Sequence, residues 1–355
     1  MEPHTTRQLG VEVKPRDAVE IHQRIKALGI LDMRKKPITT KTQVIFPIIT
    51  DEGLSEHLSS LHFTIRNHTF PEQVERASIV ERLRKKYPDQ AWGSINLKFD
   101  QLGNIAVLKL DPKQTKLEFR QHVGVEILKM HPKIKSVVNK SDVITGVERK
   151  YPIEYLTGSE KTQSWHREYG LWIYFDLNHT YFNPRLADEH HRIALTINPN
   201  DKILDMFTGV GPFALHCAKR VPCSVVAIDS NPWAIKALQR SILRNKLRGS
   251  IVPILGDTNQ VLKDFEGTSY FDRVIINLPQ YSVDYLELAA KLSKKGGVVT
   301  FYQFFLRAAS VQKDITSLLE DKIAHINSYK VVYSRIGARD ISPSRIQVNV
   351  DVQIG

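Results

Sequence analysis

Residues 205–213 read DMFTGVGPF, and this segment indicates how the second half of the chain is built. An apolar strand ends at Asp205, a glycine loop follows, and Pro212 opens a helix. Gly209 and Gly211 let the backbone approach a ligand closely, because no Cβ stands in the way. Strand-like runs then alternate with helical stretches, at residues 202–207, 224–229, 251–255, 271–277 and 297–301. This rhythm predicts a doubly wound, Rossmann-like α/β domain with a largely parallel sheet.

Acidic residues follow the next two predicted strands. Asp229 lies 20 residues after Gly209, where a carboxylate can accept hydrogen bonds from both hydroxyls of a ribose. Asp257 follows the third strand and is suited to an adenine amino group. We therefore predict a nucleoside-containing cofactor at this edge of the sheet. Its predicted contacts are Asp205, Phe207, Gly209, Gly211, Asp229, Ser230, Asp257, Thr258 and Asn277.

Two classes of cofactor compete for this site. Gly209-x-Gly211-x-x-Ala214, with an acid about 20 residues later, also satisfies the dinucleotide fingerprint. Asp205, however, would repel a pyrophosphate, whereas it suits the cationic methionyl group of S-adenosylmethionine (AdoMet). The run Asn277-Leu278-Pro279 after the fourth strand is also foreign to a dinucleotide site. These features favour AdoMet and a class I methyltransferase domain.

Composition limits the partners and the compartment. The 355-residue chain carries a net charge of +12, which favours polyanions such as nucleic acids, although a generally basic protein fits the charge as well. It contains no apolar run long enough for a membrane span, and its N-terminus lacks a signal-peptide pattern. The two cysteines, Cys217 and Cys223, suggest neither a disulfide framework nor a zinc site. We expect a cytoplasmic monomer that needs no metal.

The chain is predicted to contain three units. Residues 1–60 form a small N-terminal α/β module, 61–75 a linker, 76–165 a middle α+β domain that binds RNA, and 166–355 the methyltransferase domain. In the middle domain, runs at 95–99 and 105–110 around a Gly103-Asn104 turn predict a hairpin, and 117–130 a helix. Near the C-terminus, strand signals at 330–333 and 345–352 predict an antiparallel hairpin at the sheet edge.

The segment YFNPRLADEHHR, residues 181–192, is dense in groups that can perform chemistry. Methylation of a protonated ring nitrogen requires a general base for the proton and a donor for the oxyanion on the adjacent carbonyl. Such a carboxylate base needs a pKa raised toward neutrality, for instance by partial burial. On composition alone, an exposed helix start at Asp188-Glu189 and two surface histidines are the favoured interpretation.

The ordered set of motifs changes that interpretation. DMFTGVGPF, YFNPRLADEHHR and the NLP run resemble the archaeal and eukaryotic tRNA (guanine-37, N1)-methyltransferase family. The likeness extends upstream through residues 98–110, 146–158 and 164–186, and thus covers nearly the whole chain. No single motif is decisive, but their order is specific. The resemblance implies methyl transfer from AdoMet to N1 of guanosine 37 in the anticodon loop of tRNA.

The resemblance also implies roles for individual residues. Glu189 matches the general base for the N1 proton, and Arg149 the arginine that stabilises the 6-oxo group. Asn277 matches the asparagine that helps to position the guanine. Tyr181, Pro279 and Arg185 are expected on the substrate side, and His190 at a further cofactor-contacting position.

Substrate range and RNA contacts are left open by the sequence. Family members often carry lysine after NLP, whereas this chain has Gln280 and Tyr281. A related enzyme that methylates a tricyclic wyosine precursor, or transfers an aminocarboxypropyl group, is an alternative; a nucleic-acid-binding protein with a vestigial cofactor domain is another. Tyr302 and Phe304 either form an aromatic wall for the base or pack in the core. Candidate phosphate contacts lie in the basic runs 34–36, 82–86, 129–140 and 335–345.

Overall fold

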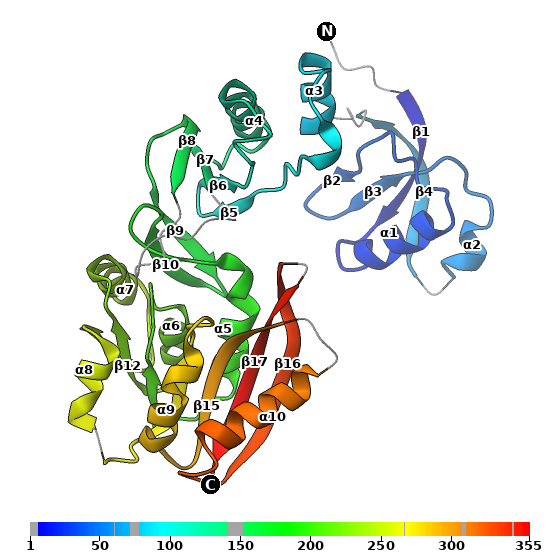
Figure 1. Cartoon of the computed structure of the whole chain (residues 1–355). Helices are drawn as coiled ribbons and strands as arrows, with labels where there is room; N and C mark the ends of the chain where they lie inside the picture. Colours follow the sequence, from blue (N-terminus) through cyan, green and yellow to red (C-terminus); the bar gives the residue numbers. More distant parts are fainter. Residues whose placement is uncertain are drawn as a thin grey trace. The chain divides into compact units, whose positions relative to one another are not determined.

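The chain divides into two compact units, Met1–Ser78 and Ile79–Gly355, and each is described by itself (Figure 1). The computed structural model describes residues 6–59, 61–71, 78–140, 152–265, 267–306, 310–342 and 344–355. Among the described helices, none combines the length and the apolar composition that a bilayer crossing requires.

The N-terminal unit is an antiparallel sheet covered by helices. Its elements are β1 (Thr6–Val13), α1 (Ala18–Ala27), β2 (Ile38–Thr39), β3 (Val44–Pro47), α2 (Leu54–His57) and β4 (Phe63–Phe70). The strand order is β2-β3-β1-β4. Ile21 and Ile25 lie four residues apart on α1, so both face the sheet, and they are buried with Val11 and Phe46. This burial gives the small unit a core of its own.

The linker predicted over residues 61–75 is wrong for most of its length. Strand β4 lies within it and pairs with β1 from Phe63, opposite Val13, to Phe70, opposite Thr6. Apolar side chains alternate with polar ones only at Phe63 and Ile65. Asn67 and Thr69, which continue the same face, are polar, so the sequence lacks a clear strand signal.

The middle part of the chain is an α+β arrangement, as predicted. It comprises α3 (Ile79–Lys86), the 3-10 turn η1 (Trp92–Ser94), β5 (Asp100–Leu102), β6 (Ile105–Leu108), α4 (Leu117–Met130), β7 (Ser136–Lys140) and β8 (Ile153–Gly158). The strands form a sheet of order β5-β6-β7-β8, and a hairpin turns at Gly103 as predicted, but its first strand is β5 and not the predicted run 95–99. The strand predicted at residues 95–99 is absent. Ile95, Leu97 and Phe99 instead pack, partly buried, against the core as irregular chain, so their alternation reflects burial without a strand ladder.

The methyltransferase part is built on a seven-stranded sheet of order β13-β12-β11-β14-β15-β17-β16. Its strands are β11 (Lys202–Asp205), β12 (Ser224–Asp229), β13 (Ser250–Leu255), β14 (Phe271–Ile276), β15 (Ser293–Leu306), β16 (Tyr329–Ser342) and β17 (Arg345–Ile354). The first five pair in parallel, whereas β17 pairs antiparallel with both β15 and β16. This confirms the predicted doubly wound sheet with an antiparallel hairpin at one edge.

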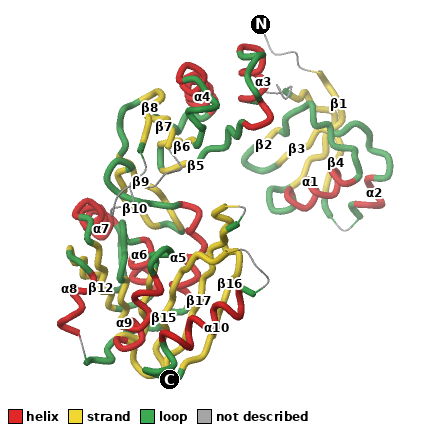
Figure 2. Tube along the Cα trace, in the orientation of Figure 1, coloured by secondary structure: helices red, strands yellow, loops and turns green. Residues whose placement is uncertain are grey.

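Helices cover both faces of this sheet, as Figure 2 shows. They are α5 (Ala187–Leu195), α6 (Pro212–Arg220), α7 (Pro232–Arg244), α8 (Thr258–Val261), α9 (Leu286–Leu292) and α10 (Val311–Lys322), with 3-10 turns η2 (Pro184–Leu186), η3 (Leu262–Phe265) and η4 (Ser282–Tyr285). Alternate residues of β11 divide between two cores: Ile203 packs with residues of α5, α6 and α7, and Leu204 with residues of α9 and α10.

A further hairpin, β9 (Gln163–Glu168) and β10 (Leu171–Asp176), precedes this sheet. Side chains of α7 cover the free edge of β10: the backbone N–H of Tyr174 donates to Ser241 Oγ at 2.9 Å, and that of Trp172 to Asn245 Oδ1 at 2.9 Å. The domain boundary predicted between residues 165 and 166 therefore falls inside β9. Strand β10 packs on the methyltransferase part, whereas Ser164 of β9 also hydrogen-bonds Asn104 of the middle part.

Candidate active site

The glycine loop lies between β11 and α6. Gly209 and Gly211 have φ angles of 55° and 82°, in the left-handed region that favours glycine. A Cβ on Gly211 would stand 2.2 Å from Leu238 Cδ1, so glycine is also required for the close packing of this turn on α7. Pro212 occupies the first turn of α6, as predicted. The loop thus presents its backbone at the carboxyl end of β11.

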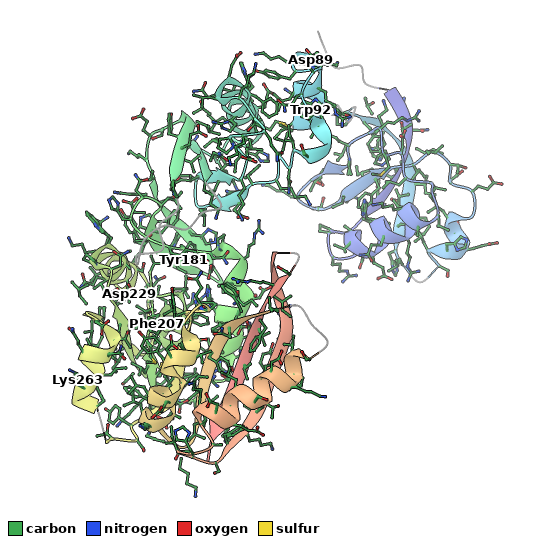
Figure 3. All side chains as sticks on the ribbon, viewed as in Figure 1. Asp89, Trp92, Tyr181, Phe207, Asp229 and Lys263 are labelled. Carbon is green, nitrogen blue, oxygen red and sulfur yellow. The ribbon has the colours of Figure 1, made fainter. Side chains whose placement is uncertain are left out.

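Asp229 stands beside this loop at the end of β12. Its Oδ2 accepts from the Gly209 N–H at 2.7 Å, and its Oδ1 accepts from the Asn231 N–H at 2.9 Å. Tyr181, Phe207 and Asp229 lie in the same region of the domain (Figure 3). The carboxylate therefore holds the glycine loop against β12 and stands where the sequence places a ribose.

The other predicted cofactor contacts gather around the same edge. Phe207 packs edge to face on Tyr285, with ring centroids 4.7 Å apart. Asp257 caps α8 by accepting from the backbone of Asn259 through Oδ1 at 3.0 Å, while the Thr258 hydroxyl donates to the Met206 carbonyl at 2.8 Å. Ser230, directly after Asp229, is exposed. The side chains of Asp257 and Thr258 thus shape the loop after β13, a role that the sequence did not reveal.

Asp205, at the end of β11, is fully buried and incompletely satisfied. Thr208 donates to its Oδ2 at 2.8 Å, while its Oδ1 has no hydrogen-bond partner among the described residues. Burial raises the pKa of this carboxyl to about 7. An orphaned carboxylate oxygen beside a glycine loop fits a ligand that brings a cationic donor, as the methionyl amino group of AdoMet does. The residues present therefore suit the cofactor predicted from the sequence.

We expect the affinity for AdoMet to fall as the pH drops below about 7, up to tenfold per unit. Since the raised pKa keeps Asp205 protonated in the ligand-free protein there, binding a cation must displace that proton. Calorimetric titration from about pH 5 to about pH 7, in buffers of different ionisation enthalpy, measures the proton release. Asp205→Asn should abolish the pH dependence. Equal affinity and no proton release across this range would show that Asp205 does not meet the cation.

Glu189 lies in the first turn of α5, and its residue is only 7% exposed. Arg192, one helical turn later, donates two hydrogen bonds to this carboxylate: Nε to Oε2 at 2.9 Å and Nη2 to Oε1 at 2.7 Å. The Tyr302 hydroxyl of β15 donates to Oε1 at 2.8 Å. The predicted base is therefore a buried, charge-paired carboxylate and not the exposed residue that composition alone favours.

Arg192 also reaches across to the last strand of the sheet. It donates to Asp351 of β17, through Nη1 to Oδ2 at 2.9 Å and Nη2 to Oδ1 at 3.3 Å. The pairing of Glu189 with Arg192 was not predicted, although their spacing is the one at which helical side chains meet. Tyr302 is fully buried, so of its two sequence interpretations the core position is correct, with the added contact to Glu189.

His190 belongs to a buried cluster with Glu168 and His216. His190 Nδ1 and His216 Nε2 lie 2.9 and 3.2 Å from Glu168 Oε2. Burial opposes the charge of Glu168, but these hydrogen bonds outweigh it and lower its pKa to about 2. The ligand-type atoms lie within 4.8 Å of one another, a spacing that hydrogen bonding explains without an ion. The cluster joins β9, α5 and α6, and a contact between His190 and the cofactor stays a prediction.

The structure places two of the predicted substrate residues, Pro279 and Arg185, by their contacts. Pro279 is buried, and its carbonyl accepts from the Phe304 N–H at 3.1 Å, which fixes the loop after Asn277. Arg185 is exposed and pairs with Asp100 of β5, with Nη2 2.8 Å from Oδ1. Arg149 lies outside the described residues. Arg185 thus links the segment before α5 to the middle domain.

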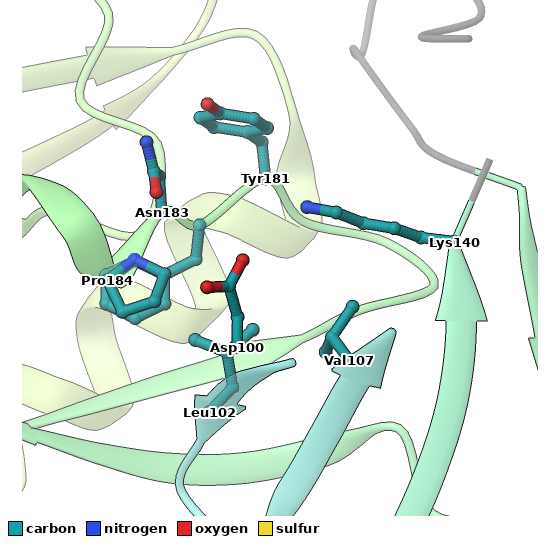
Figure 4. Close-up of a pocket in the computed structure, with 8 residues that line it drawn as sticks. Asp100, Leu102, Val107, Lys140, Tyr181, Asn183 and Pro184 are labelled. Carbon is teal, nitrogen blue, oxygen red and sulfur yellow. The ribbon is translucent and has the colours of Figure 1, made fainter. Parts of the chain in front are cut away.

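A small pocket lies between the middle domain and the segment before α5 (Figure 4). Tyr181, Asn183 and Asp100 line it together with Lys140. Asn183 accepts from the Arg185 N–H through Oδ1 at 3.3 Å, while its Nδ2 is buried and has no partner among the described residues. A buried donor without a partner is costly, so this amide favours a ligand with a hydrogen-bond acceptor.

Comparison with known proteins agrees with this geometry. Residues 164–332 match the family described as the TRM5/TYW2 methyltransferase domain, and residues 79–162 match the TYW2 N-terminal domain. The tRNA (guanine(37)-N(1))-methyltransferase Trm5b of Pyrococcus abyssi is 32% identical over 300 residues, which cover 83% of this chain and 84% of that protein. Trm5b of Methanocaldococcus jannaschii is 32% identical over 257 residues, covering 71% of this chain and 73% of that protein.

Solved structures give the same result. The crystal structure of Trm5b from Pyrococcus abyssi aligns with a TM-score of 0.69 at 27% identity, covering 98% of this chain and 99% of that one. The complex of aTrm5 with tRNALeu aligns with a TM-score of 0.68 at 26% identity, covering 98% and 100%. The resemblance found in the sequence motifs is thereby confirmed, and the chain belongs to the tRNA (guanine(37)-N(1))-methyltransferase family.

Proposed function

We propose that this chain transfers the methyl group of AdoMet to N1 of guanosine 37 in tRNA. The observation that carries the proposal is the position of Glu189. This buried carboxylate lies on α5, which the Glu168 cluster joins to α6, the helix that follows the glycine loop. A proton acceptor and a methyl-donor site therefore stand on neighbouring elements, as methylation of a protonated ring nitrogen requires.

The substrate side is proposed from residues around the pocket and on the loop after β14. Tyr181, Asn183 and Arg185 face or flank the pocket of Figure 4, with Asn277 and Pro279 on the loop after β14. We assign Arg149 to the 6-oxo group of guanine on the family match alone. The basic runs remain our proposed phosphate contacts, and we expect the protein to act as a cytoplasmic monomer.

The decisive experiment is mass analysis of tRNA after incubation with the protein and AdoMet. Unmodified tRNA with guanosine at position 37 should gain one methyl group, and so should the inosine variant, because inosine keeps both the N1 proton and the 6-oxo group. Adenosine at this position lacks the proton and should remain unmodified. Failure to modify the guanosine tRNA would contradict the proposal.

A second candidate is transfer of the larger aminocarboxypropyl group to a wyosine precursor. The match of residues 79–162 to the TYW2 N-terminal domain is the observation that supports this second candidate. The same mass measurement separates the two, because the precursor-containing tRNA would then gain the larger group and the guanosine tRNA would gain nothing.

A further inference from the structure

Glu189 has little hydrogen-bonding capacity left for a substrate proton. An ionised carboxylate offers about four acceptor positions. Arg192 and the Tyr302 hydroxyl occupy three of them, two on Oε1 and one on Oε2. Among the described residues, no further donor reaches Oε2. The base is thus held in one orientation, with a single position on Oε2 available for the proton.

The charges around Glu189 come from several elements. The charged or titratable groups that the described residues bring to it directly or through Arg192 are Arg192 on α5, Tyr302 on β15, Asp351 on β17, Arg273 on β14 and Tyr333 on β16. Arg273 lies 3.7 Å from Asp351, and the guanidinium of Arg192 lies over the Tyr333 ring, 3.9 Å from its centroid. With Glu189 ionised, two cations and two anions balance one another.

The protonation states of Arg192 and Tyr302 support this charge balance. Burial opposes the charge of Arg192, but its hydrogen bonds to Glu189 and Asp351 outweigh burial and raise its pKa above the ordinary value. Burial, reinforced by the neighbouring Glu189, raises the pKa of Tyr302 well above its usual range. Arg192 therefore stays charged and Tyr302 stays a donor throughout the working pH range.

We propose that Arg192 is a positioning residue shared between two carboxylates, and that Asp351 sets the basicity of Glu189 by drawing Arg192 toward itself. This inference rests on the proposed function. A carboxylate bound by an arginine alone is a poor proton acceptor, because the charged partner favours its ionised form. A second carboxylate on the same guanidinium weakens that hold and makes Glu189 a stronger base.

The same arrangement accounts for the charge after the reaction. Guanine N1 forms its bond to the methyl group and gives its proton to Oε2 of Glu189, while the electron pair of the broken methyl–sulfur bond stays on the sulfur of the donor. Glu189 is then neutral, and without Asp351 the half-buried guanidinium of Arg192 would be left without an anionic partner. A partly desolvated charge without a partner is destabilising. Asp351 therefore keeps Arg192 paired throughout.

The test is the pH dependence of the single-turnover rate, with AdoMet and tRNA saturating, in four variants. Arg192→Gln removes the cation, so Glu189 keeps its proton to a higher pH, and the acidic limb of the profile should move up by about one unit. Tyr302→Phe removes one donor and should move it in the same direction. Asp351→Asn leaves Arg192 wholly to Glu189, so the limb should move to lower pH and the plateau rate should fall. Arg192→Lys, which keeps the charge, should restore part of the wild-type profile.

A purely structural role would not produce shifts of opposite sign. Arg220→Gln is the matched control, because the side-chain contacts that the structure describes for Arg220 are with the backbone carbonyls of Ala194 and Ile197, at 3.1 and 2.8 Å. It should lower the melting temperature and leave the limb in place. Unchanged AdoMet affinity identifies the folded variants, and if Asp351→Asn does not fold, limbs that fail to move up in Arg192→Gln and Tyr302→Phe still overturn the inference.

Limbs that stay in place, or that move together in Arg192→Gln and Asp351→Asn, overturn the inference. The proposed function fails separately, if guanosine 37 gains no methyl group or if Glu189→Gln retains the wild-type rate. Loss of turnover in Glu189→Gln without the opposed shifts would thus remove the shared arginine and leave the base assignment standing.

Discussion

Replacing Glu189 by glutamine is expected to lower the single-turnover rate of methyl transfer to tRNA by about 100-fold or more, the usual contribution of a general base. Glutamine has nearly the same shape and still accepts from Tyr302, while Arg192 keeps Asp351 as its partner. The variant therefore loses the proton acceptor and little of the packing. Rapid-quench assays with AdoMet that carries a labelled methyl group measure the rate directly.

The affinity of Glu189→Gln for AdoMet and its melting temperature serve as internal controls. The affinity should stay close to the wild-type value, since the residue lies outside the glycine loop. The melting temperature should fall, because the glutamine amide replaces one of the two carboxylate oxygens that accept from Arg192, but the variant should remain folded at the assay temperature. Asp188, the exposed acid that precedes Glu189 in the same helical turn, gives a matched control variant, and Asp188→Asn should keep most of its activity. A wild-type rate in Glu189→Gln would show that another group takes the N1 proton.

Replacing Asp229 by alanine is expected to weaken AdoMet binding by at least about 100-fold, because two hydrogen bonds from a ribose to a charged group are lost, at about 1.5–3 kcal/mol each. The change also deprives the Gly209 and Asn231 N–H groups of their acceptor and so loosens the glycine loop. Isothermal titration with AdoMet measures the loss.

Asp321→Ala is the control for Asp229→Ala, because Asp321 is an exposed acid on α10 whose ion-pair partner is its neighbour Lys322. It should bind AdoMet as the wild type does. Equal affinity in Asp229→Ala, in a protein with an unchanged melting temperature, would place the ribose elsewhere.

The parallel sheet was predictable because its signals are local. Each strand of the methyltransferase part is a short apolar run followed by a turn residue, and Asp205 and Asp229 stand at strand ends where the sequence shows them. Strand β4 lacked such a signal. It is held by its ladder to β1, a pairing between residues far apart in the chain, and its exposed side chains resemble those of a linker.

The candidate site was predictable only in part, for a related reason. Glu189 and Arg192 lie within one helical turn, so their pairing is readable from their spacing. Tyr302 and Asp351, in contrast, reach the same spot from β15 and β17, and no local pattern connects them to α5. The sequence also suggested a raised pKa through burial as the way to tune the base, whereas the structure surrounds Glu189 with an arginine and a tyrosine hydroxyl.

The antiparallel hairpin of β16 and β17 has a consequence for protein engineering. Such a hairpin could be taken for a part that only completes the sheet. A chimaera that joins one class I domain to the closing strands of another would then be designed as if these strands were interchangeable. Here β17 carries Asp351 to Arg192, so a graft with an apolar residue at this position would still complete the ladder to β15. By our inference, such a hybrid would retain the sheet pairing but lose the carboxylate that shares Arg192 with Glu189.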